Sequence, residues 1–409
     1  MGNKEKIILH CDINNFFASV ECVLNPNIST QPVAVGGDVI ERHGIILAKN
    51  YVAKSYGIVT GDTIQDAKLK CKDILIVKPH YLEYQKYSHL ARNIYKRFTD
   101  KVESFGMDEC WLDVTDSVSL FGSPKELADK IRLTIKEELG LTISVGVSFN
   151  KIFAKLGSDM KKPDATTVIS KDDYKEKVWP LPIEDLLGVG RNTRKVLRKY
   201  FINTIGDLAK EDKKTLERLF GKNGITLYEY ANGLYNDEVI DSDDDNDVKS
   251  IGHGTTTMTD ITSKDEVWKI LFELSKEISY KLRKYKKRAK GVSISIRNNE
   301  LEHTQFQKQF SKSVISTQEI SKAGFELFND KYLFERPIKS ITITAIKLID
   351  EDECAEEFDI LADDSYSNKL ENIENTVEKI NDKYSNEKVD SAVVKDNDFI
   401  AKSTDFSSF

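Results

Sequence analysis

The order in which strands and helices alternate over the first 150 residues most strongly limits what this chain can fold into. Apolar runs predict strands, and amphipathic patterns predict helices between the first and second strands and between the third and fourth. The expected strands are 7–12, 101–106, 109–115 and 141–149. This order is that of a split βαββαβ sheet, with an insertion at about 15–80 after its first strand.

One helix of this sheet has clear end signals. Ser123 can cap its start, Pro124 suits its first turn, and Gly140 can end it. Four apolar residues at a spacing of four line one face between these ends: Leu127, Ile131, Ile135 and Leu139. A helix over 123–140 with one buried face is therefore expected.

The composition of the 409 residues excludes several classes of protein. No apolar run approaches the roughly 18 residues of a membrane span, and the N-terminus lacks a signal-peptide cleavage pattern. The five cysteines form no CxxC pair, and the six histidines form no HxH or HExxH motif. These absences argue against a disulfide framework and a cysteine zinc site. We therefore expect a reduced cytoplasmic protein of bacterial or archaeal type.

Acidic residues are concentrated in two places. Residues 237–247 carry seven acids and no base, and residues 350–409 carry 18 acids and six lysines. Removing both from the net charge of −7 leaves +12 on the rest of the chain. A basic body suits a polyanionic partner, and acidic runs are usually solvated linkers or tails. The alternative is that +12 over this length is only modestly basic.

Three acidic residues stand at the ends of predicted strands. Asp12 ends the first strand, and Asp108 and Glu109 lie at the tight connection between the two middle strands. These strands are adjacent in a split βαββαβ sheet, so the three carboxylates can converge at one edge. Carboxylates without histidine or cysteine favour Mg²⁺ or Mn²⁺. The alternative is that Asp12 caps the next helix and that Asp108 and Glu109 form a polar turn.

Five motifs in one order resemble those of Y-family translesion DNA polymerases. They are HCDINNFFASVE (10–21), NYVAKSYGI (50–58), GMDECWLDVT (106–115), VGVSFNKIFAKLGSDMKKP (145–163) and LGVGRNTRKVLRKY (187–200). The resemblance is closest to the DNA polymerase IV (DinB-like) branch, with the UmuC-like branch second, and covers about residues 5–349. It implies low-fidelity, template-directed transfer of dNTPs to a primer 3'-hydroxyl on damaged DNA.

The resemblance also implies an α+β multidomain fold shaped like a right hand. A ferredoxin-like βαββαβ palm would take 1–14 and 81–170, and small fingers would take 15–80. The remaining parts would be a helical thumb with a helix–hairpin–helix at 171–236, an acidic linker at 237–249, an α+β little finger at 250–349, and an acidic tail at 350–409. Spacing within that tail predicts an amphipathic helix at 368–384.

Carried over by motif, Asp12, Asp108 and Glu109 resemble the ligands of two catalytic Mg²⁺ ions, for which Mn²⁺ could substitute, and Ile13 resembles a backbone ligand. Nucleotide contacts are expected from Asn15, Phe16, Phe17, Tyr51, Lys54 and Lys162. Phe17 resembles the steric gate that excludes a 2'-hydroxyl. The family more often has arginine at Lys54, and lysine loses the bidentate fork. Gly106-Met107 also replaces a serine-bearing motif.

Two basic segments are candidates for contacts with DNA. Gly188 and Gly190 resemble a helix–hairpin–helix turn whose backbone amides approach a phosphate, followed by the basic residues Arg191 and Arg194. The segment 281–290 holds seven basic residues. From it we expect Lys284, Lys286, Lys287 and Arg288 to lie along phosphates, unless this segment is simply a solvated helix face.

The expected partners are primer–template DNA and dNTPs, for a protein that works as a monomer. The tail segment EEFDILADD (356–364) is a candidate contact with the sliding clamp through Phe358, Ile360 and Leu361, although it lacks the usual glutamine. These residues could instead pack against the little finger. Two other functions stay open: a nucleotidyl cyclase with a similar sheet, and a non-catalytic protein that binds damaged DNA.

Overall fold

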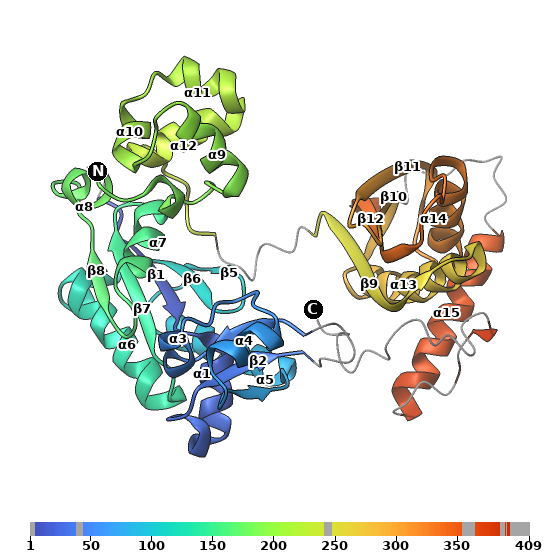
Figure 1. The fold of residues 1–409 in the computed structure, drawn as a ribbon, viewed down its shortest axis with the longest axis horizontal. Coiled ribbons are helices and arrows are strands. Elements are labelled where there is room, and N and C mark those ends of the chain that lie inside the picture. Colours follow the sequence, from blue (N-terminus) through green and yellow to red (C-terminus); the bar gives the residue numbers. More distant parts are fainter. Residues whose placement is uncertain are drawn as a thin grey trace. The chain divides into compact units, whose positions relative to one another are not determined.

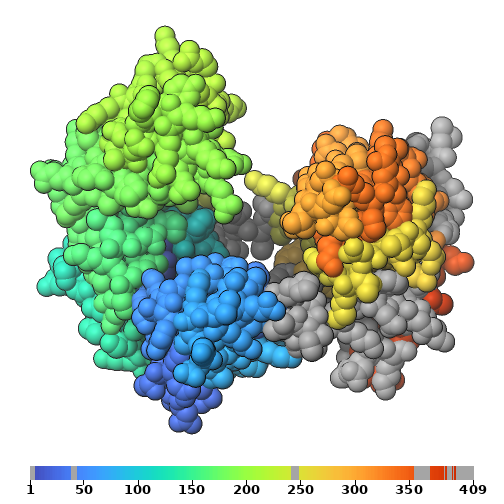
Figure 2. Space-filling view, in the orientation of Figure 1, coloured from blue at the N-terminus to red at the C-terminus, as the bar shows by residue number. Residues whose placement is uncertain are grey.

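The chain forms two compact units, Met1–Asn246 and Asp247–Phe409 (Figures 1 and 2). This computed structural model describes residues 5–37, 44–240, 248–353, 365–384, 389, 391 and 392, without the side chains of 365–368 and 382. The boundary between the units falls inside the stretch 237–249. No described helix is both long and apolar enough to cross a membrane.

A five-stranded sheet organises the first unit. Its order is β5 (Val102–Phe105), β6 (Glu109–Asp113), β1 (Ile8–Ile13), β7 (Ile143–Ser148) and β8 (Thr166–Val168). The central strand β1 runs antiparallel to both of its neighbours, and β8 adds a parallel strand beside β7. Apart from β8, this is the strand arrangement that the sequence predicts.

Helices α5 (Tyr81–Tyr95) and α6 (Pro124–Leu139) cover one face of this sheet. Helix α6 begins with the predicted cap, since Ser123 accepts from the backbone of Glu126 and the Glu126 side chain accepts from the backbone of Ser123. Its apolar face is buried in one cluster with the inward residues of β1 and β7. The predicted helix over 123–140 is confirmed.

Helix α7 (Lys151–Met160) packs on the opposite face of the sheet, against β1 and β7. The contact depends on Gly146, because a Cβ atom there would lie 1.8 Å from the carbonyl oxygen of Ala154. A glycine lets the helix backbone approach the strand closely. This approach brings the polar side chains of α7 over the outward residues of β1.

A small three-stranded sheet follows β1 in the chain and has its own core. It has the order β3 (Ile46–Lys49), β2 (Val33–Gly36) and β4 (Leu75–Val77). Its surrounding helices are α1 (Phe16–Leu24), η1 (Pro26–Ile28), α3 (Tyr51–Ser55) and α4 (Ile64–Lys70). Buried side chains from the strands and from α4 form a separate cluster, so this insertion is a local module.

The last part of the first unit is helical. It contains α8 (Tyr174–Val178), η3 (Ile183–Asp185), α9 (Arg191–Lys199), α10 (Ile205–Lys210), α11 (Lys213–Phe220) and α12 (Lys222–Ala231). The sequence predicted a short helix on each side of Gly188-Val189-Gly190, but the segment before these glycines forms only the single turn η3. Pro180 and Pro182 precede that turn, and proline removes the backbone donor that a longer helix needs.

The second unit is a four-stranded antiparallel sheet packed against two helices. Its order is β11 (His303–Val314), β10 (Lys287–Asn298), β12 (Ile338–Asp350) and β9 (Ser250–Ile261). Helices α13 (Lys264–Lys284) and α14 (Thr317–Lys331) share its core. From the sequence, strands are expected at 291–298 and 340–349 and a helix near 317–329. These correspond to parts of β10 and β12 and to α14, whereas β9, β11 and α13 were not predicted.

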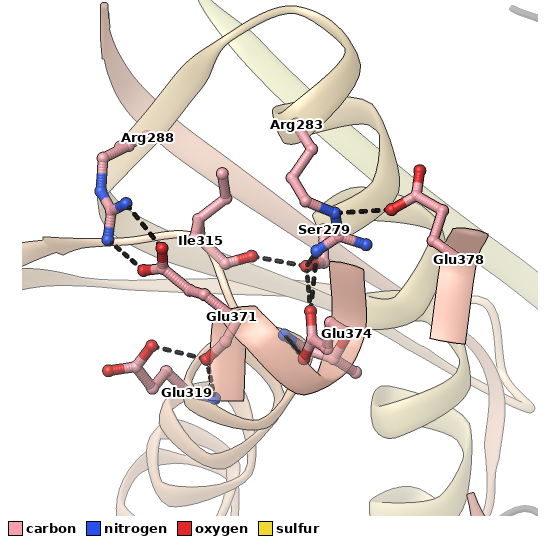
Figure 3. Close-up of polar contacts among 10 residues, drawn as sticks. Ser279, Arg283, Arg288, Ile315, Glu319, Glu371, Glu374 and Glu378 are labelled. Atoms are coloured by element: carbon pink, nitrogen blue, oxygen red, sulfur yellow. Dashed lines mark hydrogen bonds and ion pairs between the residues drawn. The ribbon is translucent and has the colours of Figure 1, made fainter. Parts of the chain in front are cut away.

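The last helix of the second unit, α15 (Ser365–Tyr384), contacts the rest of that unit through acidic side chains (Figure 3). It confirms the helix predicted at 368–384. Phe358, Ile360 and Leu361, the candidate clamp contacts, lie outside the described residues.

Candidate active site

Strand register places the acidic residues of two strands at one end of the larger sheet. Asp12 of β1 lies directly opposite Glu109 of β6. One step further along, the backbone N–H of Ile13 donates to the carbonyl oxygen of Asp108 at 2.9 Å. Residues almost one hundred positions apart in the chain therefore meet at a single sheet end.

Two lysines balance part of this negative charge, and a histidine lies beside it. Lys162 Nζ lies 2.7 Å from Asp12 Oδ2, and Lys155 Nζ lies 2.5 Å from Glu109 Oε2. His10 Nε2 lies 3.2 Å from the same Glu109 oxygen. Within the described ranges, no three aspartate, glutamate, histidine or cysteine side chains are already grouped as metal ligands. Asp12 and Glu109 are instead engaged with these basic neighbours.

The negative charge that the lysines leave unbalanced acts most strongly on Asp108. Burial, followed by repulsion from Asp12 and Glu109, raises the pKa of Asp108 from 3.8 to about 6. Burial also raises the pKa of Asp12, although Lys162 opposes it. Burial acts in the same direction on Glu109, but interactions with His10 and Lys155 outweigh it and lower the pKa of Glu109 to about 2. A cation added beside Asp108 would relieve the repulsion, so these residues suit a hard divalent metal ion.

Sequence reasoning missed His10 and Lys155. His10 precedes Asp12 by two residues, so both side chains leave β1 on the same face, toward α7. The buried imidazole lies between two groups, with Nδ1 2.8 Å from Ser158 Oγ and Nε2 near Glu109. Burial lowers the pKa of His10, which keeps the ring neutral. The alternation of side chains along a strand could have placed His10 on the same face as Asp12. Its contacts with Ser158 and Glu109 could not be predicted in this way, because they also depend on where α7 packs.

The two neighbouring phenylalanines have different environments. Phe16 is buried in the main core, whereas Phe17 is only partly buried. The Phe17 ring stacks on Tyr84 with 4.2 Å between centroids and 11° between planes. Tyr84 is held in turn by a hydrogen bond to the buried carboxylate of Glu21. The face of Phe17 is therefore supported by a rigid aromatic neighbour.

Asn15, which directly precedes Phe16, and helix α3 carry the other nucleotide contacts predicted for the first 60 residues. Asn15 has a left-handed backbone with φ 50°, and its buried Nδ2 lacks a partner among the described residues. Helix α3 carries Tyr51 and Lys54, with Lys54 Nζ 5.5 Å from the Tyr51 ring centre. Burial raises the pKa of Tyr51, with smaller effects from Lys162 and Asp12.

The glycine motif in the first unit precedes a basic helix. Gly188 has φ 90°, and Gly190 is the N-cap of α9, which begins at Arg191. Arg191 is exposed, and Arg194 lies 3.4 Å from Glu184.

In the second unit, the predicted phosphate-binding residues fall into two groups. Lys284 and Lys286 are exposed. Lys287 is buried and lies 3.0 Å from Asp350, and Arg288 is paired with Glu371. Half of this predicted set therefore already has acidic partners within the chain.

Comparison with known proteins identifies the family. The impB/mucB/samB family model matches residues 11–159, and the model of that family's C-terminal domain matches residues 248–358. A DNA polymerase IV of Acetivibrio thermocellus is 43% identical over 380 residues, which span 93% of this chain and 95% of that protein. The chain belongs to the DNA polymerase IV branch of the Y-family DNA polymerases.

Further relatives agree with this assignment. A DNA polymerase IV of Clostridium acetobutylicum is 37% identical over 80% of this chain and 83% of its own length. A solved Y-family DNA polymerase chimera of Dbh and Dpo4 superposes with a TM-score of 0.75 at 25% identity, covering 84% of this chain and 99% of the chimera. The chain is thus a translesion DNA polymerase with a mixed α+β multidomain fold, which confirms the resemblance seen in its motifs.

Proposed function

We propose that this polymerase transfers dNTPs to a primer 3'-hydroxyl at the end of the larger sheet where Asp12, Asp108 and Glu109 meet. The observation that carries the proposal is the β1–β6 register, which pairs Asp12 with Glu109 and leaves Asp108 beside them. The raised pKa of Asp108 supports it, because the carboxylates repel one another without a further cation.

The parts of the molecule then take the names of a right hand. The five-stranded sheet and its helices (1–14 and 81–170) form a ferredoxin-like palm, and the small sheet (15–80) forms the fingers. The helical region (171–236) forms a thumb with a helix–hairpin–helix. After a linker at 237–249, the second unit contributes the little finger at 250–349 and the tail.

Asp12, Asp108, Glu109 and the carbonyl oxygen of Ile13 would hold two Mg²⁺ ions, or Mn²⁺ in their place. When bound, these ions supply Lewis acidity to the 3'-hydroxyl and to the phosphate oxygens. The two lysines would move from their present acidic partners. Lys162, now paired with Asp12, is free to bind the triphosphate once its carboxylate has another cation.

Other side chains would bind and orient the nucleotide. Tyr51 and Lys54 would contact the β- and γ-phosphates, and the backbone amides of 15–17 would face the triphosphate at the start of α1, where the helix dipole favours anions. Phe17 would lie under the sugar and leave no room for a 2'-hydroxyl. Its stacking on Tyr84 supports this role, because a gate must hold its position.

Contacts with primer–template DNA would come from the amides of Gly188 and Gly190, from Arg191 and Arg194, and from the basic segment of the little finger. That segment contributes Lys284, Lys286, Lys287 and Arg288. The sliding clamp is a further proposed partner through residues 356–364. A pull-down comparing the full chain with one that ends at residue 349 tests the clamp contact.

Primer extension by Asp108→Ala tests the catalytic assignment. The variant should lose extension while primer–template binding stays nearly unchanged. Asp100→Ala is the matched control, because Asp100 is an exposed carboxylate of the same unit and should extend normally. Extension by Asp108→Ala above a few per cent of wild type would contradict the assignment. Turnover of a triphosphate without primer and template would instead favour the cyclase alternative, and DNA binding without any turnover would favour a non-catalytic protein.

A further inference from the structure

The acidic side chains of helix α15 that form ion pairs lie on one face of the helix, and its lysines are exposed to solvent. Three glutamates at positions i, i+3 and i+7 form one stripe that faces the second unit: Glu371, Glu374 and Glu378. The three lysines of the helix, Lys369, Lys379 and Lys383, are exposed. Helix α15 therefore contacts the rest of the second unit through negatively charged side chains, although the helix also carries lysines.

Two arginines, Arg283 and Arg288, form ion pairs with these glutamates (Figure 3). Arg288 forms a two-pronged contact with Glu371, with nitrogen–oxygen distances of 2.6 and 3.2 Å. Arg283 donates to Glu374 and to Glu378, both at 2.8 Å. Only 17% of the Arg283 side chain and 15% of the Arg288 side chain is exposed, so these pairs are largely withdrawn from water.

Glu374 has two further contacts. Its Oε1 accepts the backbone N–H of Thr317, the first residue of α14, at 2.8 Å, and its Oε2 lies 2.8 Å from the hydroxyl of Ser279. Arg283 Nη1 also donates to the Ser279 hydroxyl at 2.7 Å. The Ser279 hydroxyl also lies 2.5 Å from the carbonyl oxygen of Ile315 (Figure 3), so its one proton is shared between that oxygen and Glu374. We call Arg283, Arg288 and the Thr317 amide the donor surface, which combines two guanidinium groups and a helix N-terminus.

This set of donors does not distinguish a carboxylate from a phosphate. Planar guanidinium groups bind either anion through paired hydrogen bonds, and helix N-termini favour both. A half-buried arginine that loses its partner pays the cost of an unpaired charge. If α15 leaves, Arg283 loses both Glu374 and Glu378 and needs another anion. The polyanion that a DNA polymerase meets is the backbone of its substrate.

We propose that the donor surface binds the sugar–phosphate backbone of DNA and that α15 occupies it in competition with DNA. The proposal rests on the proposed contacts between the second unit and primer–template DNA. In the free protein, α15 keeps two arginines from non-specific binding. On primer–template, phosphates take the place of the glutamates on the two arginines, and the helix is released.

Competition predicts how affinity depends on salt. Each phosphate neutralised on duplex DNA contributes about 0.9 to the slope of log affinity against log salt concentration. Substituting both arginines in a chain that lacks the competing glutamates should therefore flatten this slope by about 1.8. Removing the glutamates alone should raise affinity without changing the slope, because the same two arginines contact phosphates in both complexes.

The first test compares two sets of substitutions in the full chain, using fluorescence anisotropy with a labelled primer–template. The release variant, Glu371→Gln/Glu374→Gln/Glu378→Gln, should bind severalfold tighter than wild type at low salt. The charge control removes three exposed acids of the same unit that lie outside the network, as Asp330→Asn/Glu335→Gln/Asp352→Asn. It should give the smaller effect of charge alone. Equal affinities of the two variants would overturn the proposal.

The second test places Arg283→Gln/Arg288→Gln in wild type and in the release variant. The arginine substitutions should weaken DNA binding strongly in the release variant and much less in wild type, where α15 already occupies both arginines. Equal losses in the two backgrounds would show that α15 and DNA use different surfaces.

Hydrogen exchange of the wild-type chain supplies a third measurement that needs no substitution. Saturating primer–template should speed amide exchange throughout α15, and unchanged exchange would refute the competition. The proposed function has a separate outcome, because its failure would appear as absence of primer extension by the wild-type chain. Failure of the competition would leave extension intact and abolish only the differences between variants.

Discussion

Asp108→Asn should stabilise the metal-free protein while removing its activity. Asp108 is partly buried, and burial together with Asp12 and Glu109 raises its pKa from 3.8 to about 6. Each unit of pKa difference corresponds to about 1.4 kcal/mol. The charged form of Asp108 therefore costs the folded state up to about 3 kcal/mol at neutral pH. Allowing for relaxation of the site, we expect a gain of about 1–3 kcal/mol from the neutral amide.

The stabilisation expected for Asp108→Asn depends on pH, because it depends on whether Asp108 is charged in wild type. Because the pKa of Asp108 is higher in the folded than in the unfolded chain, the folded state holds its proton more tightly between pH 3.8 and about 6. Stability is therefore lost as the pH rises through this window and stays lower above it. The advantage of Asp108→Asn should be full above pH 7 and should shrink toward zero as the pH falls to about 4.

Urea unfolding in the presence of a chelator measures the effect, with tryptophan fluorescence as the signal. Adding Mg²⁺ should then stabilise wild type more than Asp108→Asn, because a ligand that binds only the folded state shifts the equilibrium toward it. A variant no more stable than wild type at pH 7.5 would refute the electrostatic reasoning. So would a stability difference that persists unchanged at pH 4.

Three further predictions concern the surroundings of the site. Phe17→Ala should incorporate ribonucleotides much more readily in primer-extension assays, and unchanged sugar selectivity would remove Phe17 from the gate role. Gly146→Ala should lower stability by about 3 kcal/mol in thermal or urea unfolding, because the new methyl group overlaps the backbone of α7. Ser158→Ala should raise the Mg²⁺ concentration needed for half-maximal extension, since it removes the hydroxyl beside His10. Ser148→Ala is its control, because Ser148 is also buried and bonded to a backbone carbonyl, and equal metal requirements for the two would exclude a positioning role for His10.

The pattern of short strands and helices carried most of the information about the larger sheet. Apolar runs predicted its strands and an apolar spacing of four predicted helix α6, because both patterns depend on local burial. The meeting of Asp12 with Asp108 and Glu109 followed from that order. The motifs added the family, which the composition alone would not have supplied.

Contacts between different helices and strands could not be predicted from local sequence patterns. Lys155 approaches Glu109 only because Gly146 lets α7 pack closely. Strand β11 escaped notice because it is an edge strand, exposed along most of its length, so it lacks the buried alternation of an inner strand. Arg288 looked like a free cation in the sequence, since its partner Glu371 lies more than eighty residues further along.

The central place of β1 has a consequence for how the protein is made. Strand β1 is the first to leave the ribosome, yet Asp12 must wait for Glu109 on one side and for Ser144 on the other. Its apolar face therefore stays unpaired while more than a hundred residues are synthesised, whereas the small sheet of 33–77 can close early from nearby segments. Pairing over such separations is slow. Nascent chains that end before β7 should thus depend on chaperones to protect the strand that carries Asp12.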